Sequence, residues 1–552
     1  MAVCASKSLP LSLDDVGEAL GLDTLKDKRG KYLIQALCKK KAATKKLPER
    51  YNEDFALYQE LYDYCVRDVD TEYALHQRLA GLPDAELKLW QLDQKINLRG
   101  VTIDTAAVRA TIKVVERARE NLEAELFTLT DGMVASGNQV AVMREWLEEK
   151  GLDLADLRAD TVEIAMGWEM PAECRRLLEI RQSLSKNSTS KLTRMLDCVC
   201  ADGRARGMLQ FGGAHRTNRW AGRLIQPQNF PRGTVKMDMD VLVNAIHGGW
   251  NDVHELFHGS PMDAAATALR GMLTASEGSR LLVADFAQIE ARVLAVLAKQ
   301  LDLLASFEAG EDVYAVLASR IYGRAINKDD DPRERFVGKE AVLGLGYQMG
   351  ANRFFDELEK KGAPQPIEFC ENVVQIYRGE YDRIPKLWRA IEGCCIRAVL
   401  EPGKVFVFQD LKFRYAEDNL QIKLPSDRVL YYYQPKLHET TTPWGAPALK
   451  LSYMGYNNKT GAKIWGRIST YGGMLTENIV QAVSRDLMAL AMLRLETNGF
   501  PVILTVHDEV IAELPLGERT IEEFVETMEV RPKWANDYPI KAEGWEGFRY
   551  RK

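Results

Sequence analysis

Two adjacent carboxylates between apolar runs constrain this chain more than any other feature. Val502–Val506 precedes His507, Asp508 and Glu509, and the mostly apolar Val510–Leu514 follows them. Two strands joined by a tight turn would bury the apolar side chains and leave both carboxylates at the tip. Ionised carboxylates beside a buried sheet are costly unless something pairs with them. Because like charges repel, a divalent cation is the natural partner of Asp508 and Glu509.

A third carboxylate stands where another strand is expected to end. In "LLVADFAQIEAR" (Leu281–Arg292), an apolar strand leads into a helix, and Asp285 lies at the junction. Two roles fit this position, because Asp285 could cap the helix or bind a metal ion. Together with Asp508 it could hold two Mg²⁺ ions about 3.5–4 Å apart, which stabilise the attacking and leaving oxygens of a phosphoryl displacement.

A helix with two cations and an aromatic ring is expected in "PRERFVGKEAVLGLGYQMG". Arg335, Lys339, Leu343 and Tyr347 recur every four residues, which places them along one side of the helix. Cations followed by a ring suit a triphosphate and a base. The alternative is an amphipathic surface helix whose cations are merely solvated. Glycines at positions 338, 344 and 346 weaken the helix. Their presence suits the close approach of another surface.

Three further segments are rich in long basic or amide side chains. Met208–Gly233 favours a nucleic-acid contact because it concentrates such donors: Arg216, Arg219, Arg223, Arg232, Gln226, Gln228 and Asn229. Leu184–Leu196 has a mix able to grip a sugar-phosphate backbone, with Lys186, Lys191 and Arg194. The Lys-rich run Cys38–Arg50 fits a solvated loop better than a phosphate contact.

Composition bounds the class of protein. A chain of 552 residues with 46% hydrophobic and 28% charged residues predicts a globular protein of three or four domains. We expect no membrane span and no signal peptide, and therefore a cytoplasmic location. Nine scattered cysteines favour reduced thiols and make a disulfide framework or a zinc site improbable. The net charge of −6 does not exclude nucleic acid, because phosphate contacts depend on local basic clusters.

The order and wording of these segments resemble the family A DNA polymerases, the group of bacterial polymerase I and related phage polymerases. "DFAQIEAR", "RFVGKEAVLGLGYQMG" and "VHDE" resemble the family's motifs A, B and C. "AGRLIQPQNFP" is similar to the family's primer-template motif, and "YGGMLTENIVQAVSRD" most resembles the phage-type versions. The likeness runs from about residue 60 to the C-terminus.

The resemblance implies an α+β multidomain protein with the right-hand polymerase fold, in which a palm with an antiparallel sheet carries helical fingers and a helical thumb. A strand-and-turn region is expected after about residue 400, around "GKVFVF" and "DRVLYYYQPKL". The implied domains are an exonuclease-like remnant in 1–80, palm entry in 81–110, thumb in 111–200, palm with motif A in 201–292, fingers with motif B in 293–465, and palm with motif C in 466–552.

The motif matches imply roles for the candidate catalytic residues. Asp285 and Asp508 would be the two metal-binding carboxylates, with Glu509 beside them as an adjacent acidic residue. Arg335 and Lys339 would hold the incoming triphosphate, and Lys339 would also be a proton donor to the pyrophosphate leaving group.

The matches also imply roles in substrate selection and DNA binding. Tyr347 would cover the nascent base pair, and Glu290 would pair with Tyr347 and block a 2′-hydroxyl. Leu343 occupies a position that usually holds Phe or Tyr, so dideoxynucleotide discrimination does not carry over. Six residues are expected to contact primer and template: Arg223, Gln228, Asn229, Gln481, His507 and Lys191. Of these, His507 would lie near the primer terminus.

One N-terminal segment resembles part of a second activity. "YCVRD" (Tyr64–Asp68) resembles the last motif of the family's 3′–5′ exonuclease domain. The two earlier motifs, which supply the other metal-binding carboxylates, would lie before residue 1. Since Asp68 alone cannot form a two-metal nuclease site, we expect no proofreading by this chain.

The resemblance implies template-directed addition of dNTPs to a primer 3′ end, with two Mg²⁺ ions for which Mn²⁺ can substitute. The expected partners are primer-template DNA and dNTPs, and the chain is expected to be a monomer. One alternative is a single-subunit RNA polymerase, against which Glu290 beside Tyr347 argues. The other is a non-catalytic primer-template binding protein, which the presence of Asp285, Asp508, Arg335 and Lys339 disfavours.

Overall fold

The structure of this chain is a computed structural model. It describes residues 1–23, 25–43, 48–185, 188–231, 233, 235–256, 261–441, 445–457 and 464–551. Lys186, Arg232 and positions 44–47 of the Lys-rich run, which the sequence singled out, lie outside the described residues. The chain divides into two compact units, each of which is built from three segments of sequence.

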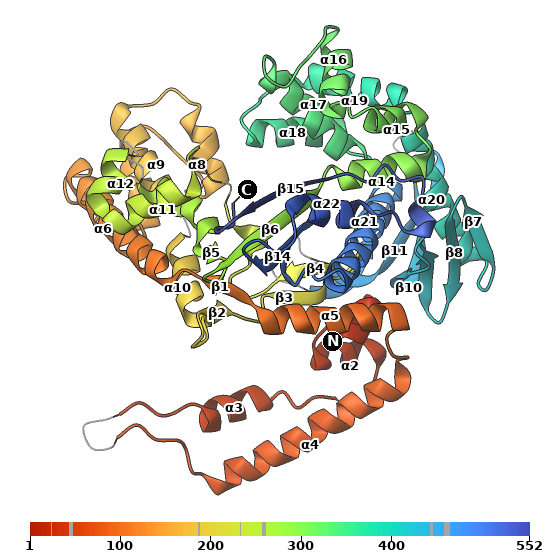
Figure 1. The fold of residues 1–552 in the computed structure, drawn as a ribbon, viewed down its shortest axis with the longest axis horizontal. Coiled ribbons are helices and arrows are strands. Elements are labelled where there is room, and N and C mark those ends of the chain that lie inside the picture. Colours follow the sequence, from red (N-terminus) through yellow and green to blue (C-terminus); the bar gives the residue numbers. More distant parts are fainter. Residues whose placement is uncertain are drawn as a thin grey trace. The chain divides into compact units, whose positions relative to one another are not determined.

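The larger unit comprises Leu92–Gln210, Trp220–Trp388 and Ser484–Lys552 and contains a four-stranded antiparallel sheet. Its strands lie in the order β13 (Val502–Val506), β14 (Glu509–Pro515), β6 (Ser279–Phe286) and β15 (Ala542–Gly547) (Figure 1). All five residues of β13 are buried, so the apolar run is sheet core, as predicted. Helix α22 (Ile521–Glu529) covers one face, where a Cβ on Gly544 of β15 would meet the side chain of Val525 at 2.6 Å.

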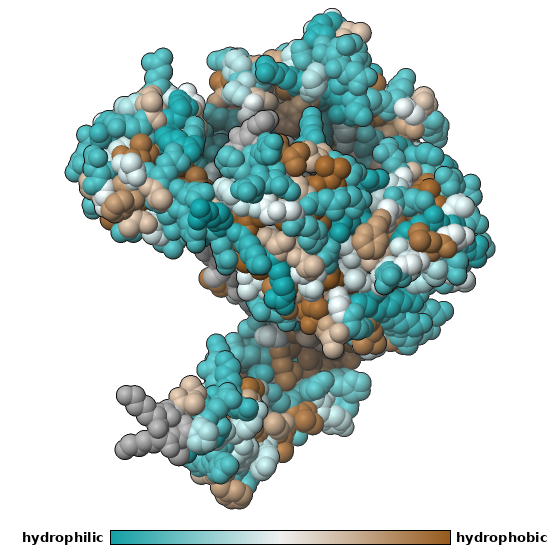
Figure 2. Space-filling view, turned by 60° about the vertical axis from the view of Figure 1, so that its left-hand side comes forward, coloured by the Kyte–Doolittle hydropathy of each residue, from teal (hydrophilic) through white to brown (hydrophobic). Residues whose placement is uncertain are grey.

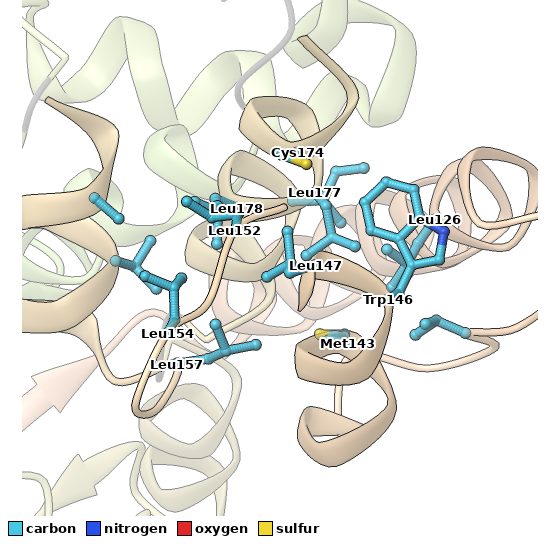
Figure 3. Packing of buried hydrophobic residues seen from close by; sticks show 14 of the residues in the cluster. Leu126, Met143, Trp146, Leu147, Leu152, Leu154, Leu157, Cys174, Leu177 and Leu178 are labelled. Carbon is cyan, nitrogen blue, oxygen red and sulfur yellow. The ribbon is translucent and has the colours of Figure 1, made fainter. Parts of the chain in front are cut away.

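The first part of the larger unit is mostly helical. Its helices are α6 (Thr105–Leu129), α7 (Val140–Glu149), α8 (Ala159–Met166), α9 (Ala172–Leu184) and α10 (Ser188–Cys198). A three-stranded sheet belongs to the same unit, with strands in the order β2 (Arg204–Ala205), β1 (Val101–Ile103) and β5 (Leu273–Thr274). Asp104 caps α6, because its side chain accepts a hydrogen bond from the backbone N–H of Ala107 at 2.9 Å. Helices α6 to α9 share a core in which Leu126, Trp146 and Leu177 are buried (Figure 3).

Short helices follow the primer-template motif and then motif A. The first group is α11 (Met239–Gly248), α12 (Trp250–Leu256) and α13 (Pro261–Ala268). After β6 come α14 (Ile289–Ala298), α15 (Leu301–Glu308), α16 (Val313–Tyr322), α17 (Pro332–Leu345), α18 (Ala351–Lys360) and α19 (Ile367–Glu380). The chain between β6 and the strands that follow residue 400 is therefore mostly helical.

The smaller unit comprises Met1–Gln91, Phe211–Arg219 and Arg389–Val483. Its centre is a six-stranded antiparallel sheet in the order β12 (Ile464–Ser469), β11 (Pro447–Asn457), β10 (Val429–Thr441), β9 (Asn419–Lys423), β8 (Leu411–Ala416) and β7 (Val405–Phe408). This is the predicted strand-and-turn region, and it lies within the range expected for the helical fingers. Each strand pairs with the strands that precede and follow it in the chain, so the sheet is a meander.

The N-terminal helices of the smaller unit are α1 (Ala2–Ser6), α2 (Leu13–Leu20), α3 (Gly30–Cys38) and α4 (Phe55–Arg78). Cys4, Leu9 and Val16 form a buried cluster with Leu75 of α4 and Tyr433 of β10 against it. The Tyr433 hydroxyl also donates to the carbonyl of Ala19 at 3.2 Å. The first two helices are therefore fastened to the six-stranded sheet.

Five elements contain residues of both units: α5 (Asp84–Arg99), β3 (Leu209–Ala214), β4 (Arg219–Gly222), α20 (Arg383–Leu400) and α21 (Gly472–Thr497). No helix among the described residues combines the length and apolar character needed to cross a membrane. The face drawn in Figure 2 is mostly hydrophilic, and its hydrophobic side chains show in separate patches. All nine cysteines are free thiols, as the scattered spacing predicted.

Candidate active site

The hairpin predicted from the apolar runs forms, with a tighter turn than expected. Val506 of β13 pairs with Glu509 of β14, so the turn consists of His507 and Asp508 alone. His507 adopts the left-handed backbone conformation, with φ of +57°, that such two-residue turns require. The expectation that both carboxylates lie at the tip is wrong for Glu509, which is the first residue of β14 and only 2% exposed.

Strand register brings the hairpin to the end of β6. Asp285 is the next-to-last residue of β6, and its Cα partners are Glu509 on β14 and Glu543 on β15. The backbone N–H of Phe286 also donates to the carbonyl of Asp508 at 3.3 Å. Asp285 and Asp508, which are 223 positions apart in the sequence, therefore lie at the same end of one sheet. Both residues are partly exposed there, whereas their neighbours in the strands are buried.

The alternative that Asp285 caps the following helix is wrong. Helix α14 starts four residues later, and its N-cap residue is Gln288, whose side chain makes no capping hydrogen bond. A buried arginine holds the strand-to-helix junction instead. Arg292 donates through Nε to the carbonyl of Ala287 at 2.8 Å and through Nη1 to the carbonyl of Pro539 at 2.7 Å. The backbone after Asp285 is thus fixed in place.

Glu509 faces a buried tyrosine. The hydroxyl of Tyr550 donates to Glu509 Oε1 at 2.5 Å, and Arg270 Nη1 donates to the same hydroxyl at 3.4 Å. Burial, and then the Glu509 carboxylate, raise the pKa of Tyr550 well above its usual value, so the hydroxyl stays protonated. The sequence singled out neither Tyr550 nor Arg270, because neither lies in a recognisable motif. Glu509 therefore has a partner inside the protein.

The primer-template motif braces the hairpin turn. Gln228, in the short 3₁₀ turn Pro227–Asn229, donates through Nε2 to the carbonyl of Thr505 at 3.0 Å. The carbonyl of Gln228 in turn lies 3.1 Å from Nε2 of His507. Two contacts from one residue thus span the strand end and the turn that carries Asp508.

The remaining predicted DNA-contacting residues occupy several elements. Arg223 is exposed directly after β4, and Asn229 donates to the side chain of Gln226 at 2.8 Å. Lys191 of α10 donates to the carbonyl of Ile225 at 3.2 Å, so it touches the primer-template segment. Gln481 lies on α21 and belongs to the smaller unit, as do Arg216 and Arg219.

The motif B helix ends earlier than its four-residue pattern predicted. Arg335, Lys339 and Leu343 lie on α17, but the helix stops at Leu345 and Tyr347 follows in a turn. The hydroxyl of Tyr347 is nevertheless 3.4 Å from Oε2 of Glu290 on α14, which is the pairing that the resemblance implied. The side chain of Leu343 is 39% exposed.

The predicted close approach at the motif B glycines is confirmed. A Cβ at Gly338 would lie 2.2 Å from the carbonyl oxygen of Tyr314 in α16, and one at Gly346 would lie 2.8 Å from the side chain of Leu294. At Gly344 the neighbour is only the flexible end of Met349, at 2.9 Å. The glycines at 338 and 346 therefore allow α17 to pack closely on α16 and α14.

The carboxylate pair fits a magnesium site that is completed by substrate. In the part of the chain that the structure describes, no group of three or more His, Cys, Asp or Glu side chains could hold a metal ion. Mg²⁺ commonly takes one or two protein carboxylates and fills its other positions with water and substrate phosphates. Asp285 and Asp508 match that donor set.

Comparisons with known proteins agree with the motifs. The sequence profile of DNA polymerase family A matches residues 260–396, which include Asp285 and Lys339. A DNA polymerase of Bacillus phage SP02 is 36% identical over 556 residues, covering 99% of this chain and 84% of the relative. A thermostable DNA polymerase I of Thermus thermophilus is 28% identical over 285 residues, covering 50% of this chain and 27% of that protein.

The fold agrees as well. The polymerase domain of Pol1 from M. smegmatis, solved in complex with DNA primer-template and dNTP, superposes with a TM-score of 0.60. The match covers 99% of this chain and 80% of that domain at 16% sequence identity, so it bears on the fold alone. The implied mixed helix-and-sheet polymerase fold is confirmed. With the long phage relative, these matches establish that the chain belongs to DNA polymerase family A and is a DNA-directed DNA polymerase.

Proposed function

We propose that this polymerase extends a primer 3′ end by phosphoryl transfer assisted by two divalent cations, which Asp285 and Asp508 hold. The observation that carries the proposal is the register of β6 against the β13–β14 hairpin. It places both residues at one sheet end, with the Phe286 N–H bonded to the Asp508 carbonyl at 3.3 Å. Magnesium bound there would lower the pKa of the primer hydroxyl and stabilise charge on the pyrophosphate oxygens.

The protein's own groups orient the nucleotide and receive its charge. Arg335 and Lys339 lie one helical turn apart on α17, so both cations can face one triphosphate. Lys339 would also donate a proton to the departing pyrophosphate. Template sequence is read by base pairing, and the protein needs only backbone and groove contacts to hold the duplex.

Glu290 and Tyr347 would select the sugar. Their side chains meet at 3.4 Å across α14 and the end of α17. A carboxylate and a ring in contact leave little room for a 2′-hydroxyl between them, which favours dNTPs over rNTPs. This contact separates the proposal from a single-subunit RNA polymerase.

DNA binding would draw on long polar side chains that the sequence singled out. Arg223, Asn229, Lys191 and Gln481 supply the long polar side chains that contact sugar and phosphate groups. Because such contacts release counterions, affinity for primer-template should fall steeply as salt rises. Gln228 and His507 would meet the DNA at the hairpin turn itself.

The test removes one carboxylate and keeps its shape. Asp285→Asn should lower primer extension by at least about a thousandfold, the scale on which removal of a charged catalytic group acts. Binding of primer-template should stay within a few-fold of wild type. Glu546→Gln is the matched control, because Glu546 is an exposed carboxylate on β15 of the same sheet and pairs with Arg280.

Extension by Asp285→Asn within about tenfold of the Glu546→Gln control would remove the support for a metal-binding Asp285. If Asp285→Asn loses both DNA binding and primer extension, the substitution has instead damaged the fold.

We also propose that these 552 residues do not remove a mismatched primer end. Asp68, the residue that resembles an exonuclease carboxylate, lies 3.4 Å from Lys26 Nζ. The acids nearby are paired with cations too, Glu18 with Lys28 and Asp27 with Arg67. A 3′-mismatched primer should keep its length in the presence of Mg²⁺. If the wild-type protein shortens this primer and Asp68→Ala abolishes the shortening, the proposal is contradicted.

A further inference from the structure

A carboxylate outside the polymerase motifs holds the guanidinium of Arg335. Asp312 Oδ2 accepts a hydrogen bond from Arg335 Nε at 2.5 Å. Its other oxygen, Oδ1, caps α16 by accepting the backbone N–H groups of Tyr314 at 3.1 Å and Ala315 at 3.3 Å. One side chain thus ties the start of α16 to the arginine of α17.

The contact uses the inner nitrogen of the guanidinium and leaves the outer ones available. Among the described residues, the side chain of Arg335 makes no hydrogen bond other than the one to Asp312. The guanidinium also lies over the ring of Tyr314, 5.4 Å from its centroid, which restricts it from a second side. The contact therefore leaves the N–H groups of Nη1 and Nη2 for a ligand, and such a planar pair of donors can bind two phosphate oxygens at once.

Burial and packing make this arrangement firm. The Arg335 and Asp312 side chains are 22% and 28% exposed, so solvent reaches both only partly. One turn along α17, Gly338 lies against the carbonyl of Tyr314 and leaves no slack between the helices. A long side chain that is already ordered loses less conformational freedom when it binds a ligand.

We propose that Asp312 is a positioning residue for the nucleotide triphosphate, acting through Arg335. This inference rests on the proposed role of Arg335 in binding dNTPs. Asp312 contributes orientation and no direct contact, because its own negative charge would repel the triphosphate. Its loss should therefore weaken nucleotide binding and change the chemical step little.

Two substitutions separate this role from helix capping. Asp312→Asn keeps an oxygen for the cap and replaces the acceptor of Arg335 Nε by a donor. Asp312→Ser also keeps a good N-cap residue, but its side chain is too short to reach Arg335. Glu334→Gln is the control, since Glu334 lies beside Arg335 on α17 and pairs instead with Arg324, which precedes the helix, at 2.7 Å.

The experiment is single-nucleotide primer extension with Mg²⁺, which gives KM for the dNTP and kcat. Both Asp312 variants should raise KM roughly tenfold, the effect of one charge-assisted hydrogen bond, with kcat within about threefold. Glu334→Gln should leave both unchanged. Arg335→Ala should also raise KM, and adding Asp312→Asn to Arg335→Ala should raise it no further.

An unchanged KM in Asp312→Asn, while Arg335→Ala raises KM, would overturn the role of Asp312 and leave the proposed function intact. An equal rise in KM with and without Arg335 would also overturn it, because a general structural effect does not depend on the arginine. If Arg335→Ala itself leaves KM unchanged, the proposed triphosphate site fails, and this inference fails with it.

Discussion

At the scale of single residues, Asp508 and Glu509 are neighbours in the chain with opposite environments. Asp508 is in the two-residue turn and partly exposed, whereas Glu509 is 2% exposed and bonded to the Tyr550 hydroxyl. A carboxylate that already has a buried donor gains less from a cation than one at an open turn. These environments support our proposal that Asp508 acts in catalysis and that Glu509 has a structural task.

The contact between Glu290 and Tyr347 gives a prediction about the sugar. Glu290→Ala removes the carboxylate 3.4 Å from the Tyr347 hydroxyl and opens space beside the ring. The preference for dNTP over rNTP in kcat/KM should fall by roughly tenfold to a hundredfold, the range that one altered pocket contact produces. Competing single-nucleotide extensions with dNTP and rNTP measure it.

Tyr347→Phe tests the same contact from the other side, because it removes only the hydroxyl. It should lower the preference less than Glu290→Ala does. A preference that Glu290→Ala leaves at the wild-type value would show that sugar selection resides elsewhere.

Residues inside the motifs could be placed from the sequence, but their partners could not. Asp285, Arg335 and Asp508 lie where the spacing put them, at a strand end, on a helix and at a turn. Asp312 and Tyr550 contact residues 23 and 41 positions away, and neither position shows a pattern of its own. Sequence periodicity reports local structure, whereas such contacts depend on how whole elements pack.

At the scale of elements, the junction of α16 and α17 depends on Gly338. A Cβ there would lie 2.2 Å from a backbone carbonyl, which cannot swing away as a side chain can. Gly338→Ala should therefore lower the free energy of unfolding by about 1–3 kcal/mol despite the better helix propensity of alanine. It should also raise KM for dNTP, because it separates Arg335 from Asp312.

Gly344→Ala is the matched control on the same helix, since its Cβ would meet only the flexible end of Met349. Denaturant unfolding and single-nucleotide kinetics of both variants compare the two sites. Equal stability of Gly338→Ala and Gly344→Ala would contradict the close approach.

The junction of α5 and β4 contains a carboxyl that should make stability depend on pH. Asp93 is 1% exposed, and burial raises its pKa from 3.8 to about 6 although Trp220, Asn97 and Gln94 donate hydrogen bonds to it. Between these two pH values the folded state keeps a proton that the unfolded state has released. The free energy of unfolding should therefore fall as pH rises from about 4 to 6, by on the order of 3 kcal/mol.

Asp93→Asn removes this titration, so its own stability should not show this fall. The stability gap, which is the free energy of unfolding of wild type minus that of the variant, should therefore decrease as pH rises through that window. Urea unfolding at pH 4, 5, 6 and 8 measures the gap. Asp410→Asn, at an exposed carboxyl, is the control. A gap that is constant with pH would show that Asp93 titrates normally.

The elements themselves were largely predictable, and their exact ends were not. Apolar alternation and runs predicted the β13–β14 hairpin, the strand before Asp285 and the strands after residue 400. The spacing of four in motif B extended the helix to Tyr347, but α17 stops at Leu345, and the carbonyl of Gly346 accepts the indole N–H of Trp388. That tertiary contact is invisible to a local pattern.

At the scale of the whole molecule, the site is assembled from segments that are distant in sequence. Motif A supplies Asp285, motif B supplies Arg335 and Lys339, and motif C supplies Asp508, all within the larger unit. The sequence indicated their common chemistry through family resemblance, and only the strand register shows how motifs A and C meet. The six-stranded sheet of the smaller unit could be predicted as strands, whereas its order needed the pairing itself.

The central claim is that Asp508, and not its neighbour, carries catalysis with Asp285. The most direct measurement is single-turnover primer extension by Asp508→Asn and Glu509→Gln side by side, with primer-template binding measured for both. Asp508→Asn should lose at least about a thousandfold in rate, and Glu509→Gln should lose no more than about a hundredfold, with binding retained in both variants. Equal losses, or a larger loss in Glu509→Gln with binding intact, would contradict the assignment.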